Sequence, residues 1–151
     1  MQFTTLLVIT STALATVEAA NAQSIAQTLA DFGLVGTWAT DCSQPASHIV
    51  YAAKSSGDMS RIYYDQTDHV FNNYRIVSAN RQGADMLALT LVWDLNSKPA
   101  EPGGDRANVV LNMVDGKFQV VSSQGSDGSY FVKDRKITRS GMESPWQQHC
   151  R

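Results

Sequence analysis

Two cysteines lie near the two ends of the chain, and the sequence has no others. Cys42 closes the segment that begins at Gly36, and Cys150 is the penultimate residue. In an oxidising compartment two lone cysteines most simply bond to each other. Such a bond would tie the first strand of a domain to its last segment and close nearly the whole fold into one loop. Cross-linking a loop of about 100 residues stabilises a fold by roughly 4 to 5 kcal/mol in the chain-entropy description.

Residues 1–22 are predicted to be an export signal. A mostly apolar run from Leu6 to Val17 precedes the small residues Ala20-Asn21-Ala22, which fit an A-x-A cleavage site. The run is interrupted by hydroxyl side chains and is shorter than the roughly 20 apolar residues of a transmembrane helix. The sequence therefore predicts a periplasmic or secreted protein without a membrane span.

The rest of the chain is predicted to form one domain with a short leading helix. Its length suffices for a single core and leaves no room for a second domain. The helix is expected within residues 23–33, where Ser24 can act as the cap, and the barrel described below within 34–151. The net charge of the whole chain is -2, and neither sign dominates a long stretch. This balance argues against nucleic acid as a partner.

After the helix, alternating or β-branched runs predict eight or nine strands. Turn residues such as Asp115-Gly116 and Asp127-Gly128 suit the positive φ of tight hairpins, so neighbouring strands should pair antiparallel. Many short strands must hide their edges, and an up-and-down barrel closed by first-to-last pairing does so economically. We therefore expect an all-β antiparallel barrel, with a mobile loop over Asn96–Asp105 at one end.

The tripeptide Gly36-Thr37-Trp38 resembles the Gly-x-Trp signature of lipocalin and calycin barrels. The resemblance implies that Trp38 plugs the closed end of the barrel, where a late arginine stacks on it. Arg139 could be that arginine. A tryptophan packed in a β core without such a role is an alternative interpretation, because tryptophan is a large residue that is usually well buried.

Three segments together are similar to those of a group of small exported proteins of alphaproteobacterial type with no assigned function. They are Gly36–Ser43, Ser126–Gly128 and Ser144–Cys150. This resemblance implies a shared fold and a shared disulfide, and it supplies no activity. The group would place Asp-Gly in the final turn, where this chain has Asp134-Arg135.

A further likeness concerns the late hairpin. Ser126, Asp127, Gly128 and Tyr130 resemble the Ser-Gly-x-x-Tyr loop with which bacterial barrel inhibitors of C-type lysozyme enter the enzyme's cleft, although Asp127 stands where that motif has glycine. Barrel-shaped metalloprotease inhibitors also begin with Gly-x-Trp. The alternative is an Asp-Gly hairpin followed by a strand tyrosine. These four residues are the candidate interaction residues of the sequence.

Enzyme signatures are missing from the sequence: it has no nucleophile elbow, zinc-binding helix, dinucleotide loop or Cys-x-x-Cys. The segment Asp65–His69 holds two carboxylates and an imidazole, but a polar turn explains it better than a metal site. Tyr63, Tyr64, Phe71 and Tyr74 are expected mainly to fill the core. We therefore predict no catalytic residue, cofactor or metal.

Two functions fit such a barrel. A hollow barrel would carry a small apolar ligand, whereas a solid one would bind another exported or host protein through its loops, for instance as an inhibitor. Alternation in the run Met86–Trp93 puts its leucines on one face, and the interior is nearly full if that face points inward. The sequence therefore favours the interaction module, and the ligand carrier is the alternative.

Overall fold

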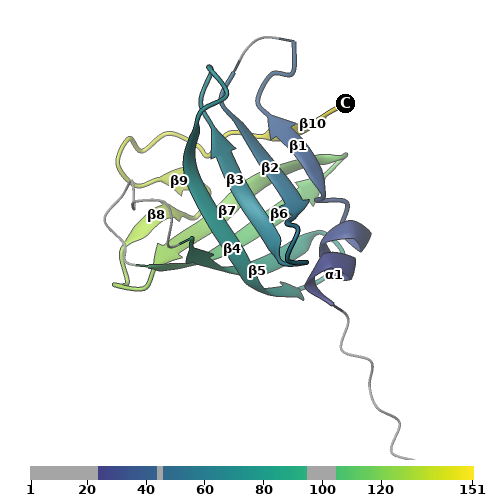
Figure 1. The fold of residues 1–151 in the computed structure, drawn as a ribbon. Helices are drawn as coiled ribbons and strands as arrows, with labels where there is room; N and C mark the ends of the chain where they lie inside the picture. Colours follow the sequence, from purple (N-terminus) through teal and green to yellow (C-terminus); the bar gives the residue numbers. More distant parts are fainter. Residues whose placement is uncertain (1–23, 44–45, 95–104) are drawn as a thin grey trace, which may run out of the picture.

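A computed structural model describes residues 24–43, 46–94 and 105–151 (Figure 1). The predicted export signal over 1–22 and most of the predicted loop from Asn96 lie outside the described residues. The described part contains one helix and ten strands: α1 Ile25–Asp31, β1 Gly36–Ala39, β2 His48–Ala53, β3 Met59–Tyr64, β4 Val70–Arg81, β5 Met86–Trp93, β6 Arg106–Val114, β7 Lys117–Gly125, β8 Tyr130–Lys133, β9 Lys136–Ile137 and β10 Gln147–Cys150.

Eight strands close an antiparallel barrel. Strands β1 to β7 follow one another around the ring, and β10 completes it by pairing with β1 on one side and with β7 on the other. The prediction of an all-β barrel closed between its first and last strands is therefore confirmed.

The strands β8 and β9 lie outside the ring of eight strands. β10 pairs with Lys117 and Phe118 at the start of β7, whereas β8 pairs with Ser123 and Gln124 near its end. The hairpin β8–β9 therefore continues the sheet outside the barrel. Its two-residue turn, Asp134-Arg135, has φ values of 51° and 65°, the positive-φ geometry that hairpin turns favour.

Helix α1 lies at one end of the barrel, which we call the closed end (Figure 1). The Ser24 hydroxyl caps the helix by accepting a hydrogen bond from the Gln27 backbone N–H at 3.2 Å. Leu29 of the helix and Leu34, which follows it, are both buried in the core. The β3–β4 and β7–β8 turns lie at the opposite end, which we call the open end, as do the last residues of β1 and β5.

Aliphatic side chains fill much of the barrel interior. On β5 the leucine face points inward, since Leu87, Leu89 and Leu91 are each at most 2% exposed. Val109 and Leu111 on β6 join the same core. Of the two faces that the sequence alternation defines on this strand, the leucine face is therefore the inward one.

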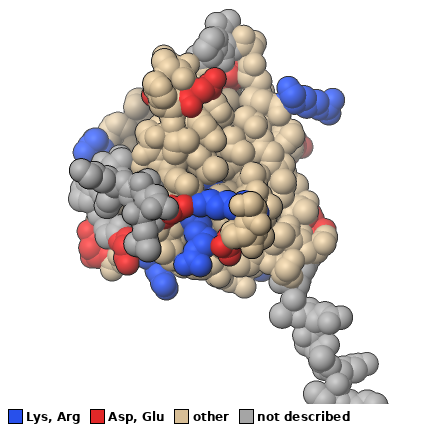
Figure 2. Space-filling view, in the orientation of Figure 1, with Lys and Arg blue, Asp and Glu red and all other residues tan. Residues whose placement is uncertain are grey.

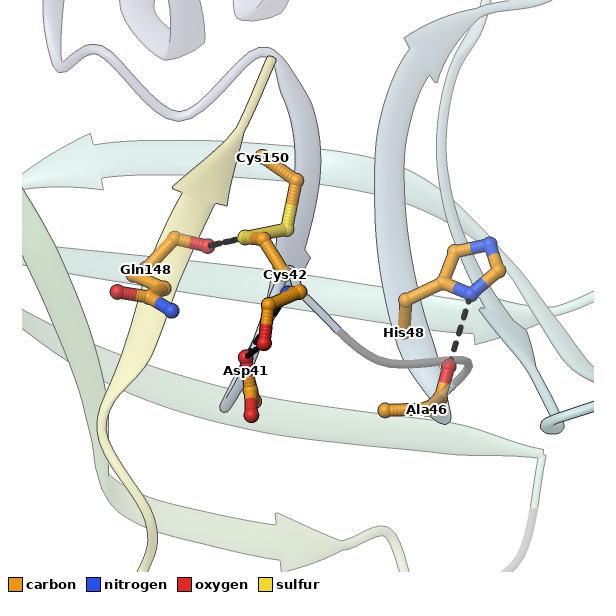
Figure 3. The surroundings of a disulfide bond; sticks show 7 residues. Asp41, Cys42, Ala46, His48, Gln148 and Cys150 are labelled. Atoms are coloured by element: carbon orange, nitrogen blue, oxygen red, sulfur yellow. Dashed lines mark hydrogen bonds between the residues drawn. A yellow bond between two sulfur atoms is a disulfide. The ribbon is translucent and has the colours of Figure 1, made fainter.

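Cys42 and Cys150 form the predicted disulfide, with their Cα atoms 5.4 Å apart across 108 residues of sequence. Figure 3 shows that the bond joins the connection after β1 to the end of β10. Asp41, next to Cys42, accepts hydrogen bonds from the backbone N–H and the hydroxyl of Ser43. Because β1 and β10 are the strands that meet when the barrel closes, the disulfide fastens this seam.

Candidate functional site

A positive charge is buried inside the barrel. Arg61, on β3, is only 3% exposed, and among the described residues no carboxylate lies within ion-pair distance of it. Its Nε atom is buried without a hydrogen-bond partner. Removing a charged group from water costs several kcal/mol, which an ion pair or hydrogen bonds usually offset. Arg61 is therefore the residue of the interior that most needs an explanation.

Aromatic rings surround the guanidinium. Tyr51 on β2 and Tyr74 on β4 lie directly opposite Arg61 in the strand registers, so the three side chains share one face of the sheet. The Arg61 guanidinium carbon lies 5.6 Å from the centre of the Tyr51 ring and 4.8 Å from that of Tyr63. A desolvated cation–π contact contributes about 2 kcal/mol, which offsets only part of the cost of burial.

These neighbours leave one permanent charge in the site. Burial raises the pKa of Tyr51 well above its ordinary value, although Arg61 opposes this rise, so the Tyr51 hydroxyl stays neutral. Burial lowers the pKa of Arg61, but Tyr51, Tyr63 and Tyr74 raise it by more, and the guanidinium stays protonated.

A cavity of about 260 Å³ lies beside Arg61. Tyr63, Phe71 and Tyr74 form its wall on β3 and β4. Val120 on β7 and Phe131 on β8 belong to the opposite wall. Among the described residues that line the cavity, Arg61 alone carries a charge. The cavity is thus a largely aromatic pocket with a single cation.

A β-bulge in each wall brings an aromatic residue to the lining of this cavity, and Phe71, the first of them, also remains 45% exposed to solvent. The register shifts between β3 and β4 beside Phe71, because Tyr63 faces Asn72 but Tyr64 faces Val70. Strict alternation would send Phe71 and Asn72 to opposite faces, yet both line the cavity. Bulges are frequent beside functional sites, where they redirect a side chain.

The second bulge is in the other wall. Ser123 of β7 pairs with Val132 and Gln124 pairs with Tyr130, so Phe131 falls at the shift. Phe131 and Val132 therefore both line the cavity although they are neighbours in sequence.

Asn72 adds a second unmatched polar group. Its side-chain oxygen is buried and has no hydrogen-bond partner. The Arg61 Nε atom and the Asn72 amide thus belong to one cavity wall. Buried polar groups are usually hydrogen-bonded, and a ligand in the cavity would give both groups a partner. Tyr51, Ser60 and Gln119 also carry unmatched buried atoms but do not line the cavity, so it is the cavity beside Arg61 and Asn72 that distinguishes these two.

The residues that the Gly-x-Trp resemblance pointed to lie at the closed end. Trp38 is 1% exposed, as expected, and its indole N–H donates to the Leu34 carbonyl oxygen at 2.8 Å. The rings that contact Trp38 belong to Phe118 and His149, with centres 5.0 and 4.9 Å away. The expectation for Arg139 is wrong, because this residue is exposed beyond β9.

Gly36 is required by the same cluster. Its φ is +132°, and a Cβ atom there would lie 2.2 Å from His149 Nε2. The absent side chain therefore makes room for the ring of His149, which packs against Trp38.

Ser126, Asp127, Gly128 and Tyr130 lie in and beside the β7–β8 turn at the open end. Asp127 accepts hydrogen bonds from the Ser129 hydroxyl at 2.6 Å and the Ser129 backbone N–H at 2.9 Å, and both lower the pKa of Asp127. Tyr130 is 38% exposed and directly precedes Phe131 of the cavity wall. The candidate interaction residues are thus at the rim of the cavity.

The β3–β4 turn at the same end holds Asp65–His69. Asp65 accepts hydrogen bonds from the hydroxyl and backbone N–H of Thr67 and from the backbone N–H of His69, and these bonds lower its pKa. In the described ranges no three His, Cys, Asp or Glu side chains converge as metal ligands. Figure 2 shows acidic side chains at the top of the molecule, where this turn lies, on a face that is otherwise mostly uncharged.

The prediction that the side chains of the aromatic stretch mainly fill the core is correct only in part. Tyr63 and Tyr74 pack against the core, as expected, and they also line the cavity with Phe71. Tyr64 instead stacks on His48 of β2, with ring centres 4.8 Å apart.

Sequence reasoning did not single out Arg61. One signal could have found it, because Arg61 alternates with Met59 and Tyr63 and so belongs to the inward set of β3. An arginine at an inward strand position is uncommon and is worth testing as a ligand-binding group.

Comparisons with known proteins add no relative. Neither a protein-family model, nor a curated protein, nor a solved structure matches this chain. Within the part of the chain that the structure describes, no helix has the length and apolar character needed to cross a membrane.

Proposed function

We propose that this chain is an exported, non-enzymatic binding module that holds a small ligand in the cavity at the open end of its barrel. The observation that carries the proposal is a pocket of about 260 Å³, open to solvent on one side, that is lined by four aromatic residues and the buried Arg61. Other hollows on the described part of the surface measure about 260 to 380 Å³, and none of them combines a buried arginine with several aromatic rings. The composition of the lining, more than its volume, therefore marks this pocket as a binding site.

The shape of the core supports a small ligand over a large one. Leu87, Leu89 and Leu91 fill the interior below the cavity, so a long ligand has no room to extend inward. Pockets for drug-sized molecules measure about 300 to 1,000 Å³, and this cavity lies just below that range. The ligand we propose is therefore the size of a single ring with a short substituent.

The test is a titration with indole, a small neutral aromatic compound of suitable size, in which binding is monitored through the backbone amide chemical shifts. We expect shifts to concentrate on β3, β4, β7 and β8. Val120→Phe fills the cavity and should weaken indole binding about tenfold or more, as expected for losing most of the contact area. Val110→Phe makes the same change on the outer face of β6 and serves as the control. Equal binding by both variants, or shifts scattered over the surface, would contradict the proposal.

Binding of another protein by the open-end turns is a second candidate, including inhibition of a lysozyme or protease. It is supported by Tyr130, which is exposed beside a turn that Asp127 holds through two hydrogen bonds. Tyrosine is a frequent anchor at protein interfaces. A pull-down from periplasmic or host extract should lose its partners with Tyr130→Ala, whereas capture of the same partners by both proteins would argue against this candidate.

A further inference from the structure

We propose that the ligand of this cavity is a small aromatic carboxylate, whose carboxylate group binds the guanidinium of Arg61. The inference rests on the proposed function and names the chemical class of its ligand.

The first step is the unmatched charge. Tyr51 and Tyr63 contact the guanidinium through their rings, and their π faces accept no strong N–H hydrogen bond. A guanidinium has five N–H donors in one plane, and the buried Nε–H of Arg61 has no acceptor. The aromatic surroundings therefore stabilise the charge but leave the buried Nε–H without an acceptor. An anionic group in the cavity would supply one.

The second step concerns the net charge of the ligand and the geometry of its anionic group. Arg61 is the single charged residue in the described lining, so the site compensates one negative charge. A carboxylate is planar and can take two parallel N–H bonds from one guanidinium. A monoanionic carboxylate fits these conditions better than a phosphate.

The third step is the body of the ligand. Rings from both walls border the cavity, Tyr63, Phe71 and Tyr74 on one side and Phe131 on the other. Aromatic rings prefer offset or edge-to-face contact with another ring at centre distances of about 4.5 to 7 Å. An aromatic ring between these walls would make such contacts with both. The unmatched side-chain oxygen of Asn72 could accept one further hydrogen bond, which would orient a donor substituent on the ring.

The experiment compares phenylacetate with phenylacetamide, which has the same shape without the charge. Titration calorimetry on the wild-type protein should show the acid binding about tenfold tighter or more, the effect of a charge-assisted hydrogen-bonded pair. Arg61→Met should remove this preference while the amide still binds. Arg61→Lys keeps the charge without the planar pair of donors and should give an intermediate preference.

A stability readout separates binding from a purely structural role. Without ligand, Arg61→Met should raise the thermal midpoint by about 4 °C or more, since replacing an uncompensated buried charge by an apolar side chain of similar length stabilises a fold. If the midpoint falls instead, Arg61 also holds the tyrosines together, and the comparison of the acid with the amide on wild-type protein then decides the inference.

The outcomes distinguish this inference from the function on which it rests. Equal affinity of wild type for the acid and the amide would overturn the carboxylate inference and leave the binding module intact. Displacement of phenylacetate by equimolar inorganic phosphate would also overturn it, because the site would then accept anions in general. Binding of neither probe nor of indole would overturn the proposed function as well. The comparison in wild type needs no variant, so a misfolded Arg61→Met leaves the test decisive.

Discussion

The two ends of the barrel are built in opposite ways. At the closed end, Trp38 is buried against Phe118 and His149, and its indole N–H has a partner. Toward the open end, the interior holds Arg61 without a carboxylate among the described residues and Asn72 with an unmatched oxygen, beside a cavity. The same sheet thus carries a packed end and an unfilled end.

The difference separates residues that hold the fold from residues that are free to bind. Satisfied polar groups and close packing are what stability requires. Unmatched buried groups reduce stability, and natural proteins retain them mainly where a function depends on them. Substitutions at the closed end should therefore lower stability strongly and leave binding intact, and substitutions in the cavity at the open end should change binding with smaller effects on stability.

The largest effect is expected for Trp38→Ala. Deleting this ring leaves a cavity in a packed region and should lower the free energy of unfolding by about 3 to 5 kcal/mol. Trp146→Ala is the matched control, since Trp146 is 40% exposed and its loss should change stability by about 0.5 kcal/mol or less. Urea denaturation measures both. Similar losses for the two variants would show that the closed end is not the packed end.

Removal of the disulfide comes next. Replacing both Cys42 and Cys150 by serine should cost about 2 to 5 kcal/mol, because the unfolded chain regains the freedom of a loop of 108 residues. The native, unreduced protein should contain no alkylatable thiol by intact mass. Because the bond fastens the β1–β10 seam, indole binding in the cavity should survive wherever the variant is still folded. Two freely alkylated thiols in the native protein would disprove the bond.

Gly36→Ala should destabilise the closed end by about 2 to 4 kcal/mol, combining a strained φ with a clash against His149. Adding His149→Ala should restore part of this loss, since it removes the clash and leaves the strain. Gly116→Ala is the control, because Gly116 has a φ of +71° but nothing within 4 Å of the added Cβ. Its cost should be about 1 to 2 kcal/mol. If His149→Ala does not restore stability to the Gly36→Ala variant, the His149 ring moves away from the added Cβ atom at no cost.

At the open end, Phe131→Ala should give the reverse profile. The ring is only partly buried, so its loss should cost about 1 to 2 kcal/mol, less than a fully buried aromatic residue. Indole binding should weaken about tenfold or more, because one wall of the cavity is lost. Unchanged binding would remove Phe131 from the site.

The smallest effect concerns the acidic turns. Hydrogen bonds from Thr67 and His69 lower the pKa of Asp65 below 3.8, so the unfolded chain takes up a proton more readily than the folded one. The stability that Asp65 contributes is therefore complete above about pH 4 and is lost as the pH falls through the lowered value. Asp65→Asn keeps an acceptor oxygen but does not titrate, so urea midpoints between pH 2 and 4 should depend less on pH. An unchanged slope would show that this turn contributes no linkage.

Local features of the sequence predicted much of the fold. The Cys42–Cys150 bond follows from the cysteine count, the common face of the β5 leucines from alternation, and the burial of Trp38 from the resemblance of its tripeptide to the Gly-x-Trp signature. Each of these depends on a residue and its near neighbours. The prediction that Arg139 stacks on Trp38 is wrong, because such a contact depends on which distant segment reaches the closed end. His149 is the residue that does so.

The candidate site was not predictable in the same way. Arg61 and Tyr63 follow the alternation of β3, but Phe71 and Phe131 enter the cavity only because a bulge shifts the period of two by one residue. Nothing local in the sequence marked either shift.

The arrangement of the chain as antiparallel hairpins could be predicted from the sequence, because turn chemistry and the alternation of side chains act over a few residues. The pairing of β10 with the start of β7, which leaves the β8–β9 hairpin outside the ring, could be seen only in the folded chain. That closure sets the wall with Phe131 across the barrel from the wall with Arg61. Which distant side chains share a cavity depends on the registers of all the strands between them, and no single segment contains that information.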